Sequence, residues 1–133
     1  MIKILQHPTF VRLSLVLWMI VITVLLLQSS GRPVVGAPAP PGAPSPEREL
    51  LLMSGHIVAF GVMLILLWGA LRPASHALLV ALITCWFYSG ATELLQRLVP
   101  DRGASLDDFA VNCLVSGIAA LVIYWRSRWK ASY

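Results

Sequence analysis

Side chains that can exchange protons or bind ligands gather in one short stretch, ATELLQRLVPDRGASLDDFAVN, which runs from residue 91 to residue 112. This stretch holds four of the six acidic residues of the chain, yet apolar sequence flanks it on both sides. Glu93 and Gln96 are three residues apart, and Asp108 and Asn112 are four apart, so each pair shares one face of a helix. Carboxylates suit acid–base chemistry, and side-chain amides suit the recognition of polar groups.

Three further residues extend this set. Arg102 lies in the hinge between two apolar segments, where a guanidinium can bind a carboxylate or an anionic ligand such as phosphate. Ser105 precedes Asp108 by three residues, a spacing typical of a helix N-cap. His56 comes from an earlier apolar segment and can act as an acid or a base. Structural roles remain open beside these functions: Asp108 as a capping residue and His56 as a hydrogen-bonded packing residue.

The composition indicates a membrane protein. Of the 133 residues, 58% are hydrophobic and only 12% are charged, whereas charged residues approach a quarter of a soluble domain. Four windows are long and apolar enough to span the bilayer as helices, at residues 10–28, 50–71, 76–95 and 109–125. We therefore predict an all-α fold, an integral membrane bundle of four transmembrane helices.

The chain divides into three parts. Residues 1–28 form the predicted N-terminal transmembrane helix, and residues 50–133 form a three-helix membrane domain with a basic C-terminal tail. Residues 29–49 carry six of the nine prolines, which predicts an extended, solvated linker on the extracytoplasmic side. A cleaved signal peptide within residues 1–28 is the alternative, but the apolar run is long for that role, which favours a retained helix.

The distribution of charge predicts that both termini are cytoplasmic, because Lys and Arg near helix ends are retained on that side. With this orientation six basic residues lie inside and four lie outside. The inner ones are Lys3, Arg12, Arg72, Arg126, Arg128 and Lys130. All six acidic residues then fall outside, although acids count little in the rule. The expected location is the cytoplasmic membrane, with the polar site on the extracytoplasmic side.

Alternating helix directions bring the polar residues of three segments to one membrane depth. His56 lies early in the second helix, Glu93 and Gln96 lie late in the third, and Asp108 and Asn112 lie early in the fourth. No cofactor and no metal site is expected, because Cys85 and Cys113 lie at different depths and form no zinc-binding spacing. A divalent ion held by His56, Glu93 and Asp108 is a variant that no diagnostic spacing supports.

The order of these residues resembles the VanZ-like family. After His56 the sequence has the pattern ExxQxxxPxRxxSxxDxxxN, in which the seven specified positions match without a gap. The matched positions are Glu93, Gln96, Pro100, Arg102, Ser105, Asp108 and Asn112. The resemblance covers about residues 55–117 and implies a small multi-pass envelope protein in a family named for glycopeptide (teicoplanin) resistance. Two features depart from the pattern: Leu52-Met53 replaces a frequent Asp-Lys pair, and Gly117 comes two residues late.

Three functions remain open at this point. The site can bind a polar or anionic envelope molecule, such as the headgroup of a lipid-linked or cell-wall precursor, through His56, Glu93, Gln96, Arg102, Ser105, Asp108 and Asn112. It can instead be an acid–base enzyme, with Glu93, Asp108 or His56 as the catalytic group. Thirdly, the cluster can lock helices together in an accessory subunit of another membrane protein. Membrane lipid is the expected partner in each case, and nucleic acid is not, because the basic residues form no long run.

Overall fold

The computed structural model describes residues 7–28, 46–72, 74–99 and 104–131, all but a few of which lie in helices. The helices are α1 (Pro8–Leu27), α2 (Pro46–Leu71), α3 (Ala77–Gln96) and α4 (Leu106–Ala131). Each contains a segment long and apolar enough to cross a membrane: Pro8–Leu27, Leu50–Leu71, Ala77–Gln96 and Leu106–Trp129. The predicted all-α fold with four membrane-spanning helices is therefore confirmed.

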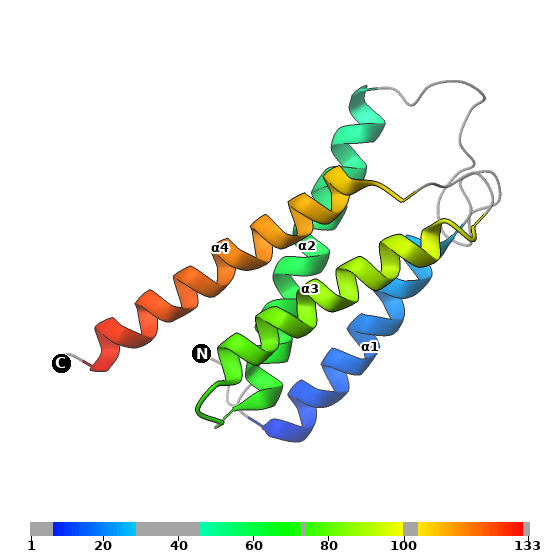
Figure 1. Cartoon of the computed structure of the whole chain (residues 1–133). Coiled ribbons are helices and arrows are strands. Elements are labelled where there is room, and N and C mark those ends of the chain that lie inside the picture. Colours follow the sequence, from blue (N-terminus) through cyan, green and yellow to red (C-terminus); the bar gives the residue numbers. More distant parts are fainter. Residues whose placement is uncertain (1–6, 29–45, 73, 100–103, 132–133) are drawn as a thin grey trace.

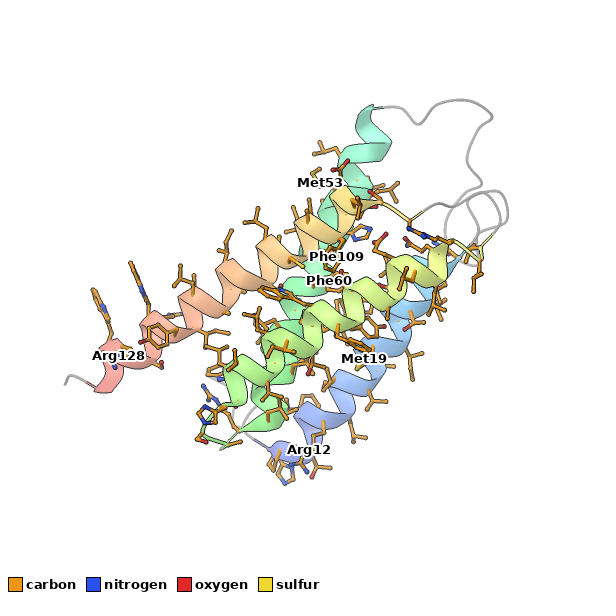
Figure 2. All side chains as sticks on the ribbon, viewed as in Figure 1. Arg12, Met19, Met53, Phe60, Phe109 and Arg128 are labelled. Carbon is orange, nitrogen blue, oxygen red and sulfur yellow. The ribbon has the colours of Figure 1, made fainter. Side chains whose placement is uncertain are left out.

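Successive helices run in alternating directions, which gives the bundle two chemically different ends (Figure 1). We call the end where α1 and α3 finish and α2 and α4 begin the site end. The opposite end, which holds the connection between α2 and α3, is the turn end. Figure 2 shows Met53 toward the site end, and Arg12 and Arg128 at the turn end.

The helices extend beyond the predicted apolar windows, most of all at the start of α2 and at the end of α4, which runs to Ala131 rather than to residue 125. Helix α2 begins at Pro46, so residues 46–49, which we assigned to the linker, form its first turn. Proline is tolerated there because the first N–H groups of a helix have no intrahelical partner. The rest of the predicted linker, residues 29–45, lies outside the described residues. Helix α4 begins at Leu106, three residues before the predicted apolar window, because the predicted N-cap, Ser105, starts it.

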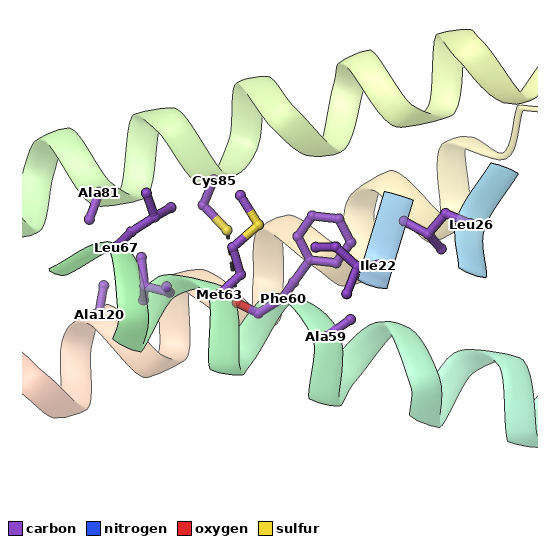
Figure 3. Close-up of a cluster of buried hydrophobic side chains, with 10 residues drawn as sticks. Ile22, Leu26, Ala59, Phe60, Met63, Leu67, Ala81, Cys85 and Ala120 are labelled. Atoms are coloured by element: carbon purple, nitrogen blue, oxygen red, sulfur yellow. Dashed lines mark hydrogen bonds between the residues drawn. The ribbon is translucent and has the colours of Figure 1, made fainter. Parts of the chain in front are cut away.

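The apolar core is centred on α2, which packs against the other three helices. Phe60, Met63 and Leu64 are fully buried there and meet Cys85 of α3 and Ile22 of α1 (Figure 3). Cys85 also donates from Sγ to the carbonyl oxygen of Phe60, at 3.8 Å. The outward faces of the helices stay rich in exposed apolar side chains, as expected of a chain whose solvent is lipid.

Helix α1 is fastened to the bundle by polar contacts as well as by packing. The indole N–H of Trp18 donates to the carbonyl oxygen of Ala59 in α2 at 3.0 Å. The Tyr88 hydroxyl of α3 donates to the carbonyl oxygen of Met19 at 3.0 Å and also contacts the hydroxyl of Thr23. Among the described residues α1 packs against α2 and α3 and makes no contact with α4. Within the described contacts, the first helix is thus held on the side that faces α2 and α3.

Candidate functional site

The polar residues predicted to converge do meet at the site end of the bundle. His56 of α2, Glu93 of α3 and Asn112 of α4 are 6%, 5% and 0% exposed, so all three lie inside the bundle. Asp108 lies one turn before Asn112 on α4, and its side chain is 41% exposed. The cluster therefore has a buried floor and one carboxylate at its rim.

Helix spacing explains why His56 can reach both α4 residues. Asp108 and Asn112 are four residues apart, so their side chains stack along the face that α4 turns toward α2. The imidazole bridges them, with Nδ1 3.1 Å from Oδ1 of Asn112 and Nε2 4.0 Å from Oδ2 of Asp108. The ring of Phe60, one turn along α2, lies nearly parallel to the imidazole at a centroid distance of 6.3 Å. The apolar core and α4 together fix the orientation of the histidine.

Asn112 determines which nitrogen of His56 carries a proton. Its Nδ2 group donates to Oγ of Ser89 in α3 at 2.9 Å, so its Oδ1 atom is left as an acceptor for the histidine. In this arrangement Nδ1 of His56 is the donor. The neutral imidazole then has its lone pair on Nε2, which is the nitrogen that faces Asp108. A chain of hydrogen bonds from α3 through α4 to α2 thus sets the tautomer of the histidine.

Glu93 is bound to the beginning of α4. Its Oε2 atom accepts a hydrogen bond from the backbone N–H of Ser105 at 3.0 Å. The Oγ atom of Ser105 in turn accepts from the backbone N–H of Asp108 at 3.1 Å, which confirms Ser105 as the predicted N-cap. A carboxylate beside a helix N-terminus is stabilised by the helix dipole. Glu93 and Ser105 therefore join the end of α3 to the start of α4.

Gln96 faces the bundle, as its spacing from Glu93 predicts, but it contacts a different neighbour. It is 2% exposed, and its Nε2 group donates to the carbonyl oxygen of Leu26 in α1 at 2.9 Å. The last carbonyl oxygens of a helix have no intrahelical N–H donor. Gln96 supplies a donor to one of them, that of Leu26. This contact places the end of α1 at the same end of the bundle as the polar cluster. A role for Gln96 in ligand binding stays a prediction.

Two buried serines belong to the site and were not predicted as part of it. Ser89 accepts from Asn112, as described above, and Ser116 accepts from the indole N–H of Trp86 at 3.0 Å while donating to the carbonyl oxygen of Asn112 at 2.7 Å. Each serine lies four residues from a predicted site residue, Ser89 before Glu93 and Ser116 after Asn112. Extending each polar helix face by one turn would have identified both.

A cleft of about 430 Å³ opens beside Glu93 between α3 and the start of α4. Its walls are mostly apolar, and Glu93, Arg97 and Ser105 supply its polar groups. The lining residues are Trp86, Phe87, Gly90, Ala91, Glu93, Leu94, Arg97, Ala104, Ser105, Leu106 and Phe109. A smaller groove of about 180 Å³, between α1 and α2, reaches His56 from the other side. The polar cluster thus has apolar space on two sides.

The remaining predicted ligand, Arg102, and the proline of the sequence pattern, Pro100, lie outside the described residues. In the part of the chain that the structure describes, no group of three or more His, Cys, Asp or Glu side chains could hold a metal ion. The described cluster can therefore accept and donate hydrogen bonds and exchange protons through His56, Glu93 and Asp108. Comparison with protein-family models, curated proteins and solved structures finds no match to this chain.

Proposed function

We propose that this multi-pass membrane protein binds the polar headgroup of an envelope amphiphile, such as a lipid-linked cell-wall precursor, at the site end of the bundle. The proposal rests on one observation: ionisable and amide groups from three helices form a single ordered cluster next to an apolar cleft. Polar groups inside a membrane are costly, so such a concentration favours a functional site.

The cleft beside Glu93 suits a ligand that is both polar and apolar. Its aromatic and aliphatic walls, which include Phe87, Leu94 and Phe109, can receive a hydrocarbon chain, and its polar groups can receive the headgroup. Asp108, at the exposed rim of the cluster, can accept hydrogen bonds from sugar hydroxyls or amines. Arg97 lines the cleft, and Arg102 is a further cation that the sequence supplies for an anionic group such as phosphate.

The predicted orientation places this site on the extracytoplasmic side, where cell-wall precursors are used. The resemblance of the sequence to the VanZ-like pattern supports the same class of function and extends it to glycopeptide (teicoplanin) resistance. Three positions of the pattern, Glu93, Ser105 and Asn112, form hydrogen bonds that join helices at this site. Because the resemblance implies glycopeptide resistance, susceptibility to glycopeptides is a suitable readout in cells.

Acid–base catalysis at the same site is the second candidate, and the geometry of His56 favours it. Asn112 holds the Nδ1 donor, so Nε2 is the available base, and the carboxylate of Asp108 lies 4.0 Å away. This separation is longer than a hydrogen bond, so a substrate hydroxyl or a water molecule could contact both groups. His56 would then take a proton from the hydroxyl, and Asp108 would stabilise the resulting imidazolium.

The experiment compares two neighbouring carboxylates. The full chain is purified in lipid, and the retained molecules are identified by mass spectrometry for the wild type, Asp108→Asn and Asp107→Asn. Asp107 is exposed and lies outside the hydrogen-bonded cluster, so its variant is the matched control. We expect Asp108→Asn to lower retention of a polar amphiphile about tenfold, as loss of a charged hydrogen bond would, and Asp107→Asn to leave it unchanged.

Three outcomes would redirect the proposal. Equal retention by all three proteins would argue for a purely structural network. If Glu93→Gln or Asp108→Asn makes the protein disappear from the membrane, the result favours a structural or accessory role over ligand binding. If His56→Gln still binds the amphiphile but no longer converts it, catalysis replaces simple binding.

In cells, Glu93→Gln and Arg102→Ala at normal abundance should abolish any change in glycopeptide susceptibility that the wild type confers.

A further inference from the structure

We propose a second binding site, at the turn end of the bundle, that holds an anionic phospholipid. It lies at the opposite end from the polar cluster and does not depend on the function proposed there. Among the described residues that reach this end, 7–14, 66–72, 74–80 and 120–131, five are Lys or Arg and none is Asp or Glu. These described segments contain no Asp or Glu side chain that could neutralise Arg72, so a lipid phosphate can supply the negative charge.

A cleft at the turn end provides a place for a lipid headgroup. It has a volume of about 430 Å³ and lies between the α2–α3 connection and the second half of α4. Its polar lining consists of Arg72, Ser75, Tyr124 and Ser127. Ser127 already donates its hydroxyl to the carbonyl oxygen of Tyr124 at 2.7 Å. The guanidinium of Arg72 and the hydroxyls of Ser75 and Tyr124 are the donors that suit phosphate oxygens. The remaining lining is mostly apolar, with Leu78 of α3 and Ile123 of α4 among it.

On both sides of this cleft, an arginine guanidinium lies over an aromatic ring. The guanidinium of Arg72 lies 3.4 Å from the centre of the Trp68 ring, and that of Arg128 lies 5.9 Å from the centre of the Tyr124 ring. Trp68 and Tyr124 both line the cleft. Stacking restrains the face of a guanidinium while its N–H donors, which lie in its plane, can reach a phosphate. Arg72 is thus held over the cleft before any ligand arrives.

An apolar groove continues from the cleft along the bundle and distinguishes a phospholipid from free phosphate. This groove, also of about 430 Å³, runs between α3 and α4 and shares Ser75, Leu78 and Tyr124 with the headgroup cleft. Leu79, Leu82 and Leu121 line it further along. At Gly117, which also lines it, a Cβ atom would meet nothing within 4 Å. A headgroup in the cleft can therefore extend an acyl chain into the groove.

The predicted orientation agrees with this ligand. It places the turn end at the cytoplasmic leaflet, where anionic lipids attract basic segments and where basic pockets between membrane helices bind lipid phosphates. We infer a phospholipid with a net negative headgroup, of which phosphatidylglycerol is the simplest representative. Its phosphate would lie on Arg72 and the hydroxyls of Ser75 and Tyr124, and one chain would lie beside Gly117.

The test is a titration of the purified full chain with phosphatidylglycerol or phosphatidylcholine, followed by native mass spectrometry. We expect the wild type to prefer phosphatidylglycerol, and Arg72→Gln to weaken its binding about fivefold while leaving phosphatidylcholine unaffected. Arg12→Gln is the matched control, because Arg12 carries the same charge at the same end but lines neither the cleft nor the groove. It should bind phosphatidylglycerol as the wild type does.

A second variant tests the groove without altering charge. Gly117→Leu places a side chain where the acyl chain would lie, on a helix that tolerates leucine well, and it should weaken phosphatidylglycerol binding although every arginine remains. The proposal is overturned if Arg12→Gln and Arg72→Gln weaken binding equally, because diffuse charge then suffices. It is also overturned if the two lipids bind alike, if Gly117→Leu binds normally, or if millimolar inorganic phosphate displaces the lipid.

Discussion

The two ends of the bundle solve the problem of polar groups in a membrane in different ways. At the site end, His56, Glu93 and Asn112 are buried and bound to one another or to the backbone of a neighbouring helix. At the turn end, Arg72 and Arg128 remain exposed and lie against aromatic rings. Burial requires a partner for each polar group, whereas long cationic side chains can reach the interface. Substitutions at the site end should therefore cost more stability.

The largest effect is expected for Asn112→Leu. The substitution removes hydrogen bonds to both His56 and Ser89 and leaves these buried groups without that partner. We expect a loss of about 2 kcal/mol in the free energy of unfolding, since each buried group left unsatisfied costs about 1 kcal/mol or more. The measurement is reversible unfolding in detergent. Leu114→Ala, on the lipid-facing side of α4, is the control, and an equal loss in that variant would contradict the comparison.

An intermediate effect is expected for Gln96→Leu. It removes one hydrogen bond, to the carbonyl oxygen of Leu26, and keeps the volume of the side chain nearly constant. The expected loss is about 1 kcal/mol, near the value typical of a single side-chain bond between membrane helices. Because this bond fastens α1, a cysteine introduced at the end of α1 should also react faster with a thiol reagent. An unchanged reaction rate would show that packing alone holds the helix.

The smallest effect is expected for Arg72→Gln. The side chain is exposed and stacks on Trp68, so its loss should change the free energy of unfolding by no more than about 0.5 kcal/mol in neutral detergent. The same substitution should reduce binding of phosphatidylglycerol about fivefold. If Arg72→Gln destabilised the protein as much as Asn112→Leu, the polar groups at both ends would contribute equally to the stability of the fold, and the comparison would fail.

The sequence predicts the fold and much of the site because the signals involved are local. Apolar length identifies the four helices, and spacings of three or four residues predict that Glu93 and Gln96 share a buried face. The exact partners depend on helix rotation and on contacts between distant segments, which one sequence does not determine. The bond from Gln96 to Leu26 joins residues 70 positions apart, and the bond from His56 to Asn112 joins residues 56 apart. Neither pairing could be predicted from spacing within one helix.

The N-terminal boundaries show the same limit. Apolar windows start α4 at residue 109, but the capping serine begins the helix at Leu106. Hydrophobicity alone omits the polar first turn that contains Asp108, whereas the spacing of Ser105 and Asp108 predicts this turn. That turn is part of the site, because it brings the carboxylate within 4.0 Å of His56. A capping signal is therefore functional information when it lies at the edge of a membrane helix.

The one-sided attachment of α1 has a consequence for how the protein assembles. Helix α1 is made first, yet two of its anchoring donors, Tyr88 and Gln96, belong to α3, which is made much later. Until then, the described contacts that can hold α1 are those with α2, through Trp18 and apolar packing. Completion of α3 therefore fastens the earliest segment in place. Because α1 makes no contact with α4 in the described part of the chain, this late step can proceed while the final helix is still entering the membrane.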